Sequence, residues 1–217
     1  MLSKEAIAVQ QALIQEGLET PMIQRSVNPS QQQHDTQEII MQLMHTLGLD
    51  LRDDSLKGTP ARIAKMFTHE IFAGLNYANF PSITTVDNKM NVDDVINVSQ
   101  IQVTSTCEHH FITIDGFAQV AYIPKHKILG LSKINRIVQF FAQRPQIQER
   151  LTQQIKIAIQ TLTDSADVAV RIRATHFCVK ARGVMDTSSM TTTLALGGQF
   201  KENKSLRAEF VHSTEQV

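Results

Sequence analysis

The segment Cys107-Glu108-His109-His110 holds the densest group of side chains in this sequence that could bind a metal ion. A thiolate and an imidazole three positions apart in a tight turn can bind one ion together, and Zn²⁺ accepts both sulfur and nitrogen ligands. The only other cysteine, Cys178, ends a long β-like stretch, and strand pairing would bring it to this turn. Cys107, His110 and Cys178 then supply three protein ligands and leave the fourth position to water, which is the catalytic arrangement of zinc.

Two further histidines lie beside this predicted metal site without being needed as ligands. His109 precedes a ligand directly, and His176 lies two residues before Cys178 on the same predicted strand face. Zinc lowers the pKa of a bound water to about 7. Neutral imidazoles near such a water are suitable proton donors and acceptors at that pH. The group therefore predicts a hydrolytic site.

A second group of side chains is basic and suits an anionic ligand. Two of its members lie in the first turns of a predicted helix whose expected cap is Ser132, and two follow Cys178. A helix N-terminus flanked by cations binds phosphate oxygens well. A polyphosphate fits this pattern, and the nearby carboxylate of Glu149 could accept two N–H groups from a purine edge. The cations are Lys133, Arg136, Lys180 and Arg182.

Each of these features also has an ordinary structural explanation. A Cys-x-x-His spacing occurs by chance, and Cys107 could pair with Cys178 in a disulfide, although a reducing cell disfavours one. His109 could face solvent, and His176 could be a hydrogen-bonded core residue. The four cations could form a solvated surface, as most charge clusters do. On the residues alone these alternatives stay open.

The composition limits the classes of protein to which this chain can belong. Its 217 residues are 42% hydrophobic, with 21 Lys and Arg against 21 Asp and Glu, so it is neither a disulfide-stapled mini-protein nor disordered throughout. A net charge of zero gives no overall attraction to nucleic acid or to an anionic membrane. No uncharged apolar run reaches the ~18 residues of a membrane span, and no secretory signal is evident. We therefore expect a cytoplasmic protein that binds neither nucleic acid nor membranes.

The first part of the chain predicts helices. Ser3 is the expected N-cap of the first helix, and Asp35 with Glu38 forms a capping box before the second. Thr59-Pro60 reads as a cap followed by a first-turn proline, which predicts a third helix. Residues 18–34, rich in Pro, Asn, Ser and Gln, are expected to form a mobile linker.

From about residue 90 the pattern changes to alternating β-formers, and the predicted class is α+β. Asp115-Gly116 supplies turn chemistry before the second strand. Two consecutive amphipathic helices follow, one capped by Ser132 and one beginning after Pro145. The predicted strands span residues 101–106, 117–123, 168–179 and 190–196.

Four segments together resemble GTP cyclohydrolase I of the zinc-dependent, bacterial and animal type. They are TPARIAKMF at 59–67, STCEHHF at 105–111, GLSKINRIVQFFAQRPQIQERLTQQI at 130–155 and HFCVKARGV at 176–184. The similarity runs from about residue 35 to 211, and several long motifs in one order make it specific. It implies hydrolytic opening of the guanine imidazole ring of GTP, release of C8 as formate and rearrangement to 7,8-dihydroneopterin triphosphate, the entry step of folate and pterin synthesis.

The resemblance also implies a role for individual residues. It places zinc on Cys107, His110 and Cys178, the same three ligands that the spacing predicts. It makes His109 the residue that protonates the purine near N7 and His176 the second catalytic histidine, on the ribose side. The residues that it places against the substrate are Glu149 and Gln148 at the guanine edge, Ser132 near the ribose, and Lys133, Arg136, Arg182, Lys180 and Arg62 at the triphosphate, with Arg62 coming from another subunit.

The fold implied by the resemblance is the tunnelling fold, an antiparallel sheet with two amphipathic helices on one face. Sheets of neighbouring subunits join edge to edge into a barrel, and we expect a homo-oligomer, a decamer of two stacked pentameric rings, with active sites between subunits. Residues 86–217 would form this catalytic domain, and residues 1–85 a helical N-terminal appendage.

Two alternatives to this function have distinct requirements. Another tunnelling-fold enzyme, such as a nitrile reductase or a pterin synthase, would need a metal-free nucleophilic cysteine with a nicotinamide cofactor, or zinc held by three histidines. A non-enzymatic, zinc-stabilised binding module would need a fourth protein ligand and would have no use for His109 or His176. The ligand set Cys107, His110 and Cys178 argues against the first of these alternatives.

Overall fold

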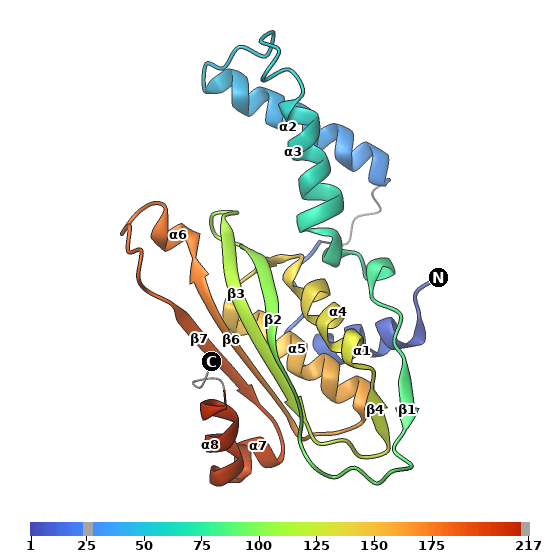
Figure 1. The fold of residues 1–217 in the computed structure, drawn as a ribbon. Coiled ribbons are helices and arrows are strands. Elements are labelled where there is room, and N and C mark those ends of the chain that lie inside the picture. The colour runs from blue at the N-terminus through green and yellow to red at the C-terminus, as the bar shows by residue number, and fades with distance from the viewer. Residues whose placement is uncertain (24–27, 214–217) are drawn as a thin grey trace.

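A computed structural model describes residues 1–23 and 28–213, and it contains both helices and strands, as the predicted α+β class requires (Figure 1). The main sheet has the strand order β5-β2-β3-β6-β7. Its pairs are antiparallel except for β2 with β5, which are parallel. The strands of this sheet are β2 (Ile96–Cys107), β3 (Thr113–Tyr122), β5 (Pro145–Gln146), β6 (Val168–His176) and β7 (Thr191–Leu196). A separate pair is formed by β1 (Thr85–Asp87) and β4 (Lys127–Leu129).

Two amphipathic helices, α4 (Leu131–Ala142) and α5 (Gln148–Thr163), cover one face of the main sheet (Figure 1). Their apolar residues recur at helical spacing and turn toward the strands, which buries them in one continuous core. The buried apolar residues of these helices include Ile134, Ile137, Val138, Phe141, Leu151, Ile155, Ala158 and Ile159.

The first helix, α1 (Lys4–Gln15), packs against α5 and shares the core of the sheet. The Ser3 hydroxyl accepts a hydrogen bond from the Ala6 N–H at 3.1 Å, as expected for its N-cap. Ala6, Val9 and Leu13 are buried in that core. The described helices α2 (Pro29–Thr46) and α3 (Thr59–Lys65) extend away from the sheet, whereas α1 lies against it (Figure 1).

The remaining helical elements are short. A π-helical turn over Met66–Ile71 continues α3 and leads to two 3₁₀ turns, at Ala73–Leu75 and Tyr77–Asn79. Near the C-terminal end lie α6 (Phe177–Lys180), α7 (Gln199–Glu202) and α8 (Lys204–His212). Among the described residues, no helix is long and apolar enough to cross a membrane.

The start of α2 corrects the predicted linker. The helix begins at Pro29, and the Asn28 side chain accepts a hydrogen bond from the Ser30 N–H at 2.9 Å. The prediction that residues 28–34 belong to a linker is therefore wrong, because Asn-Pro supplies an N-cap and a first-turn proline. Residues 24–27 of that linker lie outside the described residues.

Three predicted helix caps lie inside their helices. Asp35 lies within α2, which begins at Pro29 and has Asn28 as its N-cap. Thr59 and Ser132 occupy the first turns of α3 and α4, whose N-caps are Gly58 and Gly130 without a side-chain cap. A hydroxyl residue near a helix start predicts the start more reliably than the cap itself.

The predicted turn at Asp115-Gly116 is also wrong, since both residues lie within β3. A Cβ atom on Gly116 would lie 2.1 Å from the Arg173 carbonyl oxygen of β6. This glycine is therefore required by the close approach of the neighbouring strand and not by a turn. The tight connection between β2 and β3 lies instead at residues 108–112.

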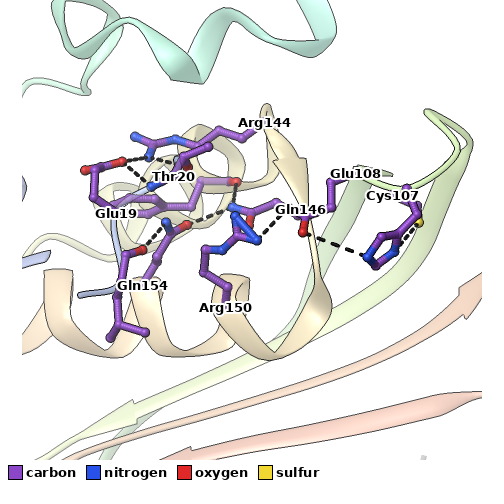
Figure 2. Close-up of polar contacts among 11 residues, drawn as sticks. Glu19, Thr20, Cys107, Glu108, Arg144, Gln146, Arg150 and Gln154 are labelled. Atoms are coloured by element: carbon purple, nitrogen blue, oxygen red, sulfur yellow. Dashed lines mark hydrogen bonds and ion pairs between the residues drawn. The ribbon is translucent and has the colours of Figure 1, made fainter. Parts of the chain in front are cut away.

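Arg144, which lies between α4 and α5, is fully buried (Figure 2). Its guanidinium lies within 5 Å of the ring centroids of Tyr77, Phe140 and Phe141. Its NH1 atom lies 2.7 Å from Oε1 of Glu19, in the segment after α1. A buried guanidinium of this kind needs its carboxylate partner, so Glu19 fixes the segment after α1 beneath the sheet helices.

Two buried glutamine amides also link the segment after α1 to β5 and α5 (Figure 2). Gln154 of α5 donates to the Leu18 carbonyl oxygen at 2.7 Å. Gln146 of β5 donates to Oε1 of Gln154 at 2.7 Å and to the Phe141 carbonyl oxygen at 2.8 Å. The segment after α1, the short strand β5 and α5 are thereby held together by these hydrogen bonds.

Replacing Glu19 with alanine should destabilise the fold strongly. Arg144 would keep its charge inside the core without a carboxylate partner, which costs about 3–5 kcal/mol in comparable buried pairs. Urea unfolding measures this loss. The exposed carboxylate of Glu16, three residues earlier, is the control, and Glu16→Ala should change the free energy of unfolding by less than about 0.5 kcal/mol. A loss below about 1 kcal/mol for Glu19→Ala would contradict the buried-pair explanation.

Candidate metal centre

The last residue of β2 and the connection that follows it, residues 107–112, carry two of the three predicted metal ligands. We call this segment the metal turn. The Cys107 N–H donates to the Ile112 carbonyl oxygen at 2.8 Å, and the Phe111 N–H donates to the Cys107 carbonyl oxygen at 2.9 Å. Phe111 has a φ of 52°, an uncommon value for a bulky side chain, which reverses the chain tightly. The Glu108 N–H donates to the Gln146 carbonyl oxygen at 3.0 Å and holds the turn against β5.

The three predicted metal ligands come together at this turn. Because β6 pairs with β3, His176 lies opposite Ile114, just after the metal turn. Cys178, two residues further on, therefore also lies near that turn. Cys178 lies in α6, so the prediction that the strand runs to residue 179 is wrong. The ligand atoms of Cys107, His110 and Cys178 all lie within 4.8 Å of one another, and both cysteines are free thiols. A disulfide is therefore not formed.

The donor set fits a metal cation. Burial raises the pKa of the Cys178 thiol, and its hydrogen bond with Cys107 raises that pKa further. A bound cation would reverse this effect, because it stabilises thiolates. Two sulfur donors and one imidazole match a zinc-type site with an open position. In the part of the chain that the structure describes, no fourth Cys, His, Asp or Glu joins the group.

Arg182 lies directly against this group. Its NH1 atom lies 2.7 Å from Nε2 of His110. Since a guanidinium only donates, Nε2 accepts this hydrogen bond, and a metal bound through that nitrogen would take the place of the contact. Lys180 is close in sequence, with Nζ 5.3 Å from the ring centroid of Phe177. Two of the predicted phosphate-binding cations thus follow the metal ligand Cys178.

His109 lies at the solvent-facing side of the metal group. Its side chain is 64% exposed, and Nδ1 lies 3.7 Å from Cys107 Sγ. Its Nε2 lies 4.0 Å from Glu108 Oε1, and Arg150 of α5 donates to the other oxygen of Glu108 at 2.5 Å (Figure 2). The pairing of Glu108 with Arg150 was not predicted from the sequence. The signals for it were a carboxylate inside the Cys107–His110 motif and an arginine two residues after Gln148.

His176 is half-buried at the end of β6, two residues before the ligand Cys178. Burial lowers its pKa, and the nearby charge of Glu149 opposes that shift. Its Nε2 lies 2.7 Å from Oε1 of Gln148. Glu149 itself is exposed in the first turn of α5. Within one chain, His109 thus lies against the ligand Cys107, and the charge of Glu149 lies close enough to act on His176.

The predicted cations of α4 lie elsewhere. The C-terminal end of α4 is the end nearer to the metal ligands, because Ser105, two residues before Cys107, donates its hydroxyl to the Ala142 carbonyl oxygen at 2.7 Å. Ser132 lies ten residues earlier, about 15 Å away along the helix axis, with Lys133 beside it. Arg136 lies roughly midway and lines a surface pocket of about 550 Å³ between α4 and β2. Within one chain, the predicted phosphate-binding residues therefore form two separate groups, one on α4 and one beside the metal ligands.

The hydrogen bonds of Arg62 are made to residues near it in sequence and not to the metal ligands. It lies on α3, where its NH2 atom donates to the Thr59 hydroxyl at 3.0 Å and approaches the Ser55 carbonyl oxygen at 3.4 Å. The helical segment that carries Arg62 nevertheless contacts the metal turn through aromatic rings. The ring centroid of Phe111 lies 6.0 Å from that of Phe67 and 5.3 Å from that of Phe72. These contacts couple the position of the metal turn to that helical segment.

This chain is similar to proteins of one family along nearly its whole length. A family model described as GTP cyclohydrolase I matches residues 36–215. A protein named GTP cyclohydrolase 1 from Aeromonas salmonicida (strain A449) is 60% identical over 210 residues, which is 97% of this chain and 96% of the relative. One of the same name from Vibrio cholerae serotype O1 is 60% identical over 211 residues, 97% of each chain. One from Shewanella oneidensis is 57% identical over 213 residues, 98% of this chain and 99% of the relative.

A solved structure of the archaeosine synthase QueF-Like aligns with 48% of this chain and 93% of its own, at 14% identity and a TM-score of 0.41, a level that supports no conclusion. The family model covers most of this chain, and the relatives match it along nearly their whole length. The chain therefore belongs to the GTP cyclohydrolase I family.

Proposed function

We propose that this protein opens the guanine imidazole ring of GTP by hydrolysis, releases C8 as formate and rearranges the remainder to 7,8-dihydroneopterin triphosphate. The observation that carries the proposal is the convergence of Cys107, His110 and Cys178 with two further histidines beside them, in a member of this family. We take the metal to be zinc, because two thiolates and an imidazole are typical zinc ligands.

The protein's own contribution at the metal is to hold it with an open position. When bound, the metal supplies a Lewis acid and a water of lowered pKa. Cys107 and His110 are held by the hydrogen-bonded metal turn, and Cys178 by the first turn of helix after β6. Their three ligand atoms are already close together, so little rearrangement of the chain is needed.

The two histidines flank the reacting ring in this proposal. His109, exposed next to the metal ligands, is placed to give a proton to the purine near N7. His176, half-buried and bonded to Gln148, is placed to move a proton on the ribose side. Imidazoles exchange protons near neutral pH and suit both roles.

Glu149 is the residue that we assign to the guanine edge. Its carboxylate is exposed at the start of α5, next to His176. A carboxylate has two acceptor oxygens and can accept both the ring N–H and the exocyclic amine of guanine. That pairing would select guanine over adenine, which lacks this pair of donors.

The triphosphate site requires a second chain. Arg182 and Lys180 lie beside the metal ligands, whereas Lys133 and Ser132 lie near the opposite end of α4. We propose that Ser132, Lys133 and Arg136 of one subunit face the metal group of a neighbour, and that Arg62 comes from a further subunit. The assembly would be a decamer of two pentameric rings, in which β7 and the uncovered part of β2 join edge to edge.

The direct test is incubation of the purified protein with GTP. Formate should be released together with a product that becomes a fluorescent pterin on oxidation, and ATP should give neither. GTP that binds but remains intact would contradict the proposed reaction and would favour a binding module.

Replacing His109 with alanine should leave the metal in place and stop ring opening. Loss of a general acid lowers kcat by roughly 10²–10⁴-fold, and His109 is not among the three ligands. Metal content by mass spectrometry and formate release are measured on the same sample. If metal content fell in parallel with activity, His109 would be a ligand and not the acid.

A further inference from the structure

Gln148 is buried beside His176, and both polar atoms of its side chain have partners inside the chain. It is 1% exposed. Its amide nitrogen lies 3.0 Å from the carbonyl oxygen of Ile172, 3.0 Å from that of Thr191 and 3.1 Å from the Thr193 hydroxyl. Its oxygen lies 2.7 Å from Nε2 of His176.

These partners determine which end of the amide faces His176. Backbone carbonyl oxygens only accept hydrogen bonds, so the –NH₂ group of Gln148 must face Ile172 and Thr191. Both N–H donors are then used, and the oxygen is the end that meets the imidazole. No side-chain N–H of Gln148 is left to read a guanine, whereas the carboxylate of Glu149 next to it is exposed.

The same geometry determines where the proton of His176 lies. An amide oxygen has no proton to give, so the hydrogen bond forms only when Nε2 of His176 carries the hydrogen. In the neutral ring the other nitrogen, Nδ1, then holds the lone pair. The ring is thereby fixed in orientation as well as in tautomer.

We propose that Gln148 is a positioning residue that holds His176 with its proton on Nε2 and leaves Nδ1 as the acceptor toward substrate. This inference rests on the proposed function, because it concerns a histidine of that site. It replaces the guanine-reading role that the resemblance implies for the Gln148 side chain and leaves, of the two side chains, that of Glu149 for the guanine edge.

Kinetics distinguish positioning from substrate binding. Gln148→Met keeps the volume and removes the acceptor, so kcat should fall by about 10²-fold while KM for GTP changes by less than about twofold. Because the effect acts through His176, the same substitution in a His176→Ala background should lower kcat no further. Gln154→Met is the matched control, since Gln154 is an equally buried amide on α5 that does not contact His176, and its kcat should stay within about twofold of the parent.

Two kinetic results would overturn the proposal. One is a rise in KM of about tenfold or more with kcat unchanged, since this is the signature of lost substrate binding. The other is an undiminished loss of kcat in the His176→Ala background. Metal content and urea unfolding of each variant show whether it is folded and loaded.

A spectroscopic measurement tests the inference without turnover. In protein labelled with ¹⁵N-histidine, the His176 signals are those absent from His176→Ala. They should show a protonated Nε2 and an unprotonated Nδ1, and Gln148→Met should give a mixture of tautomers. The opposite tautomer in the unmodified protein would overturn the proposal even if GTP is turned over. Absence of formate from GTP would instead overturn the proposed function and leave the tautomer result standing.

Discussion

Replacing Cys178 with serine should release the metal and abolish ring opening. Cys178 is one of three ligands, and a serine hydroxyl is a far poorer ligand for zinc than a thiolate. The loss in metal affinity should exceed the roughly 10–100-fold that follows from removing an outer-shell partner. Competition with a chromogenic chelator gives the metal affinity, and formate release gives the turnover.

The control for this variant is Val179→Ala in the same helical turn. Val179 is partly exposed and outside the ligand group, so its truncation should leave metal affinity and turnover near those of the parent. Full metal content in Cys178→Ser would contradict the three-ligand site. Lost turnover with retained metal would mean that Cys178 acts on the substrate and not on the metal.

Two inactive variants should restore each other's activity when they assemble together. His109→Ala damages the metal half of the site, and Lys133→Glu damages the α4 half that we assign to a neighbouring subunit. In oligomers that mix both chains randomly, roughly a quarter of the sites combine two intact halves. Co-expression with two different tags, purification through both and a GTP assay should therefore recover about a quarter of the parental turnover.

The control pairs two defects of the same half. His109→Ala with Cys178→Ser leaves every metal half damaged, so this mixture should recover nothing. A mixed assembly of His109→Ala and Lys133→Glu that is no more active than its parents would contradict a site shared between subunits. It would require α4 to reach the metal group within one chain.

The metal group and the family were predictable from the sequence because short motifs carry them. Cys107 and His110 lie in one turn, and β6, which pairs with β3, ends at His176 beside that turn, two residues before Cys178. The resemblance to GTP cyclohydrolase I is confirmed by the family match. The roles of the individual site residues stay predictions until the variants are measured.

Other features depend on contacts that sequence spacing does not show. Glu19 and Arg144 are 125 positions apart, and neither residue type suggests a buried pair. Gly116 has the appearance of a turn residue but is needed where β6 approaches β3. The basic residues looked like one cluster, yet only the direction of α4 shows that Lys133 lies far from Arg182.

The most direct test of the central claim is a metal titration of chelator-treated protein. GTP turnover, followed as formate release, should be absent without metal and should rise linearly with added zinc until one equivalent per subunit is bound. Cys107→Ser, titrated in parallel, should stay inactive throughout. Full turnover by the metal-free protein, or one equivalent of bound zinc with GTP left intact, would contradict a hydrolytic site built on Cys107, His110 and Cys178.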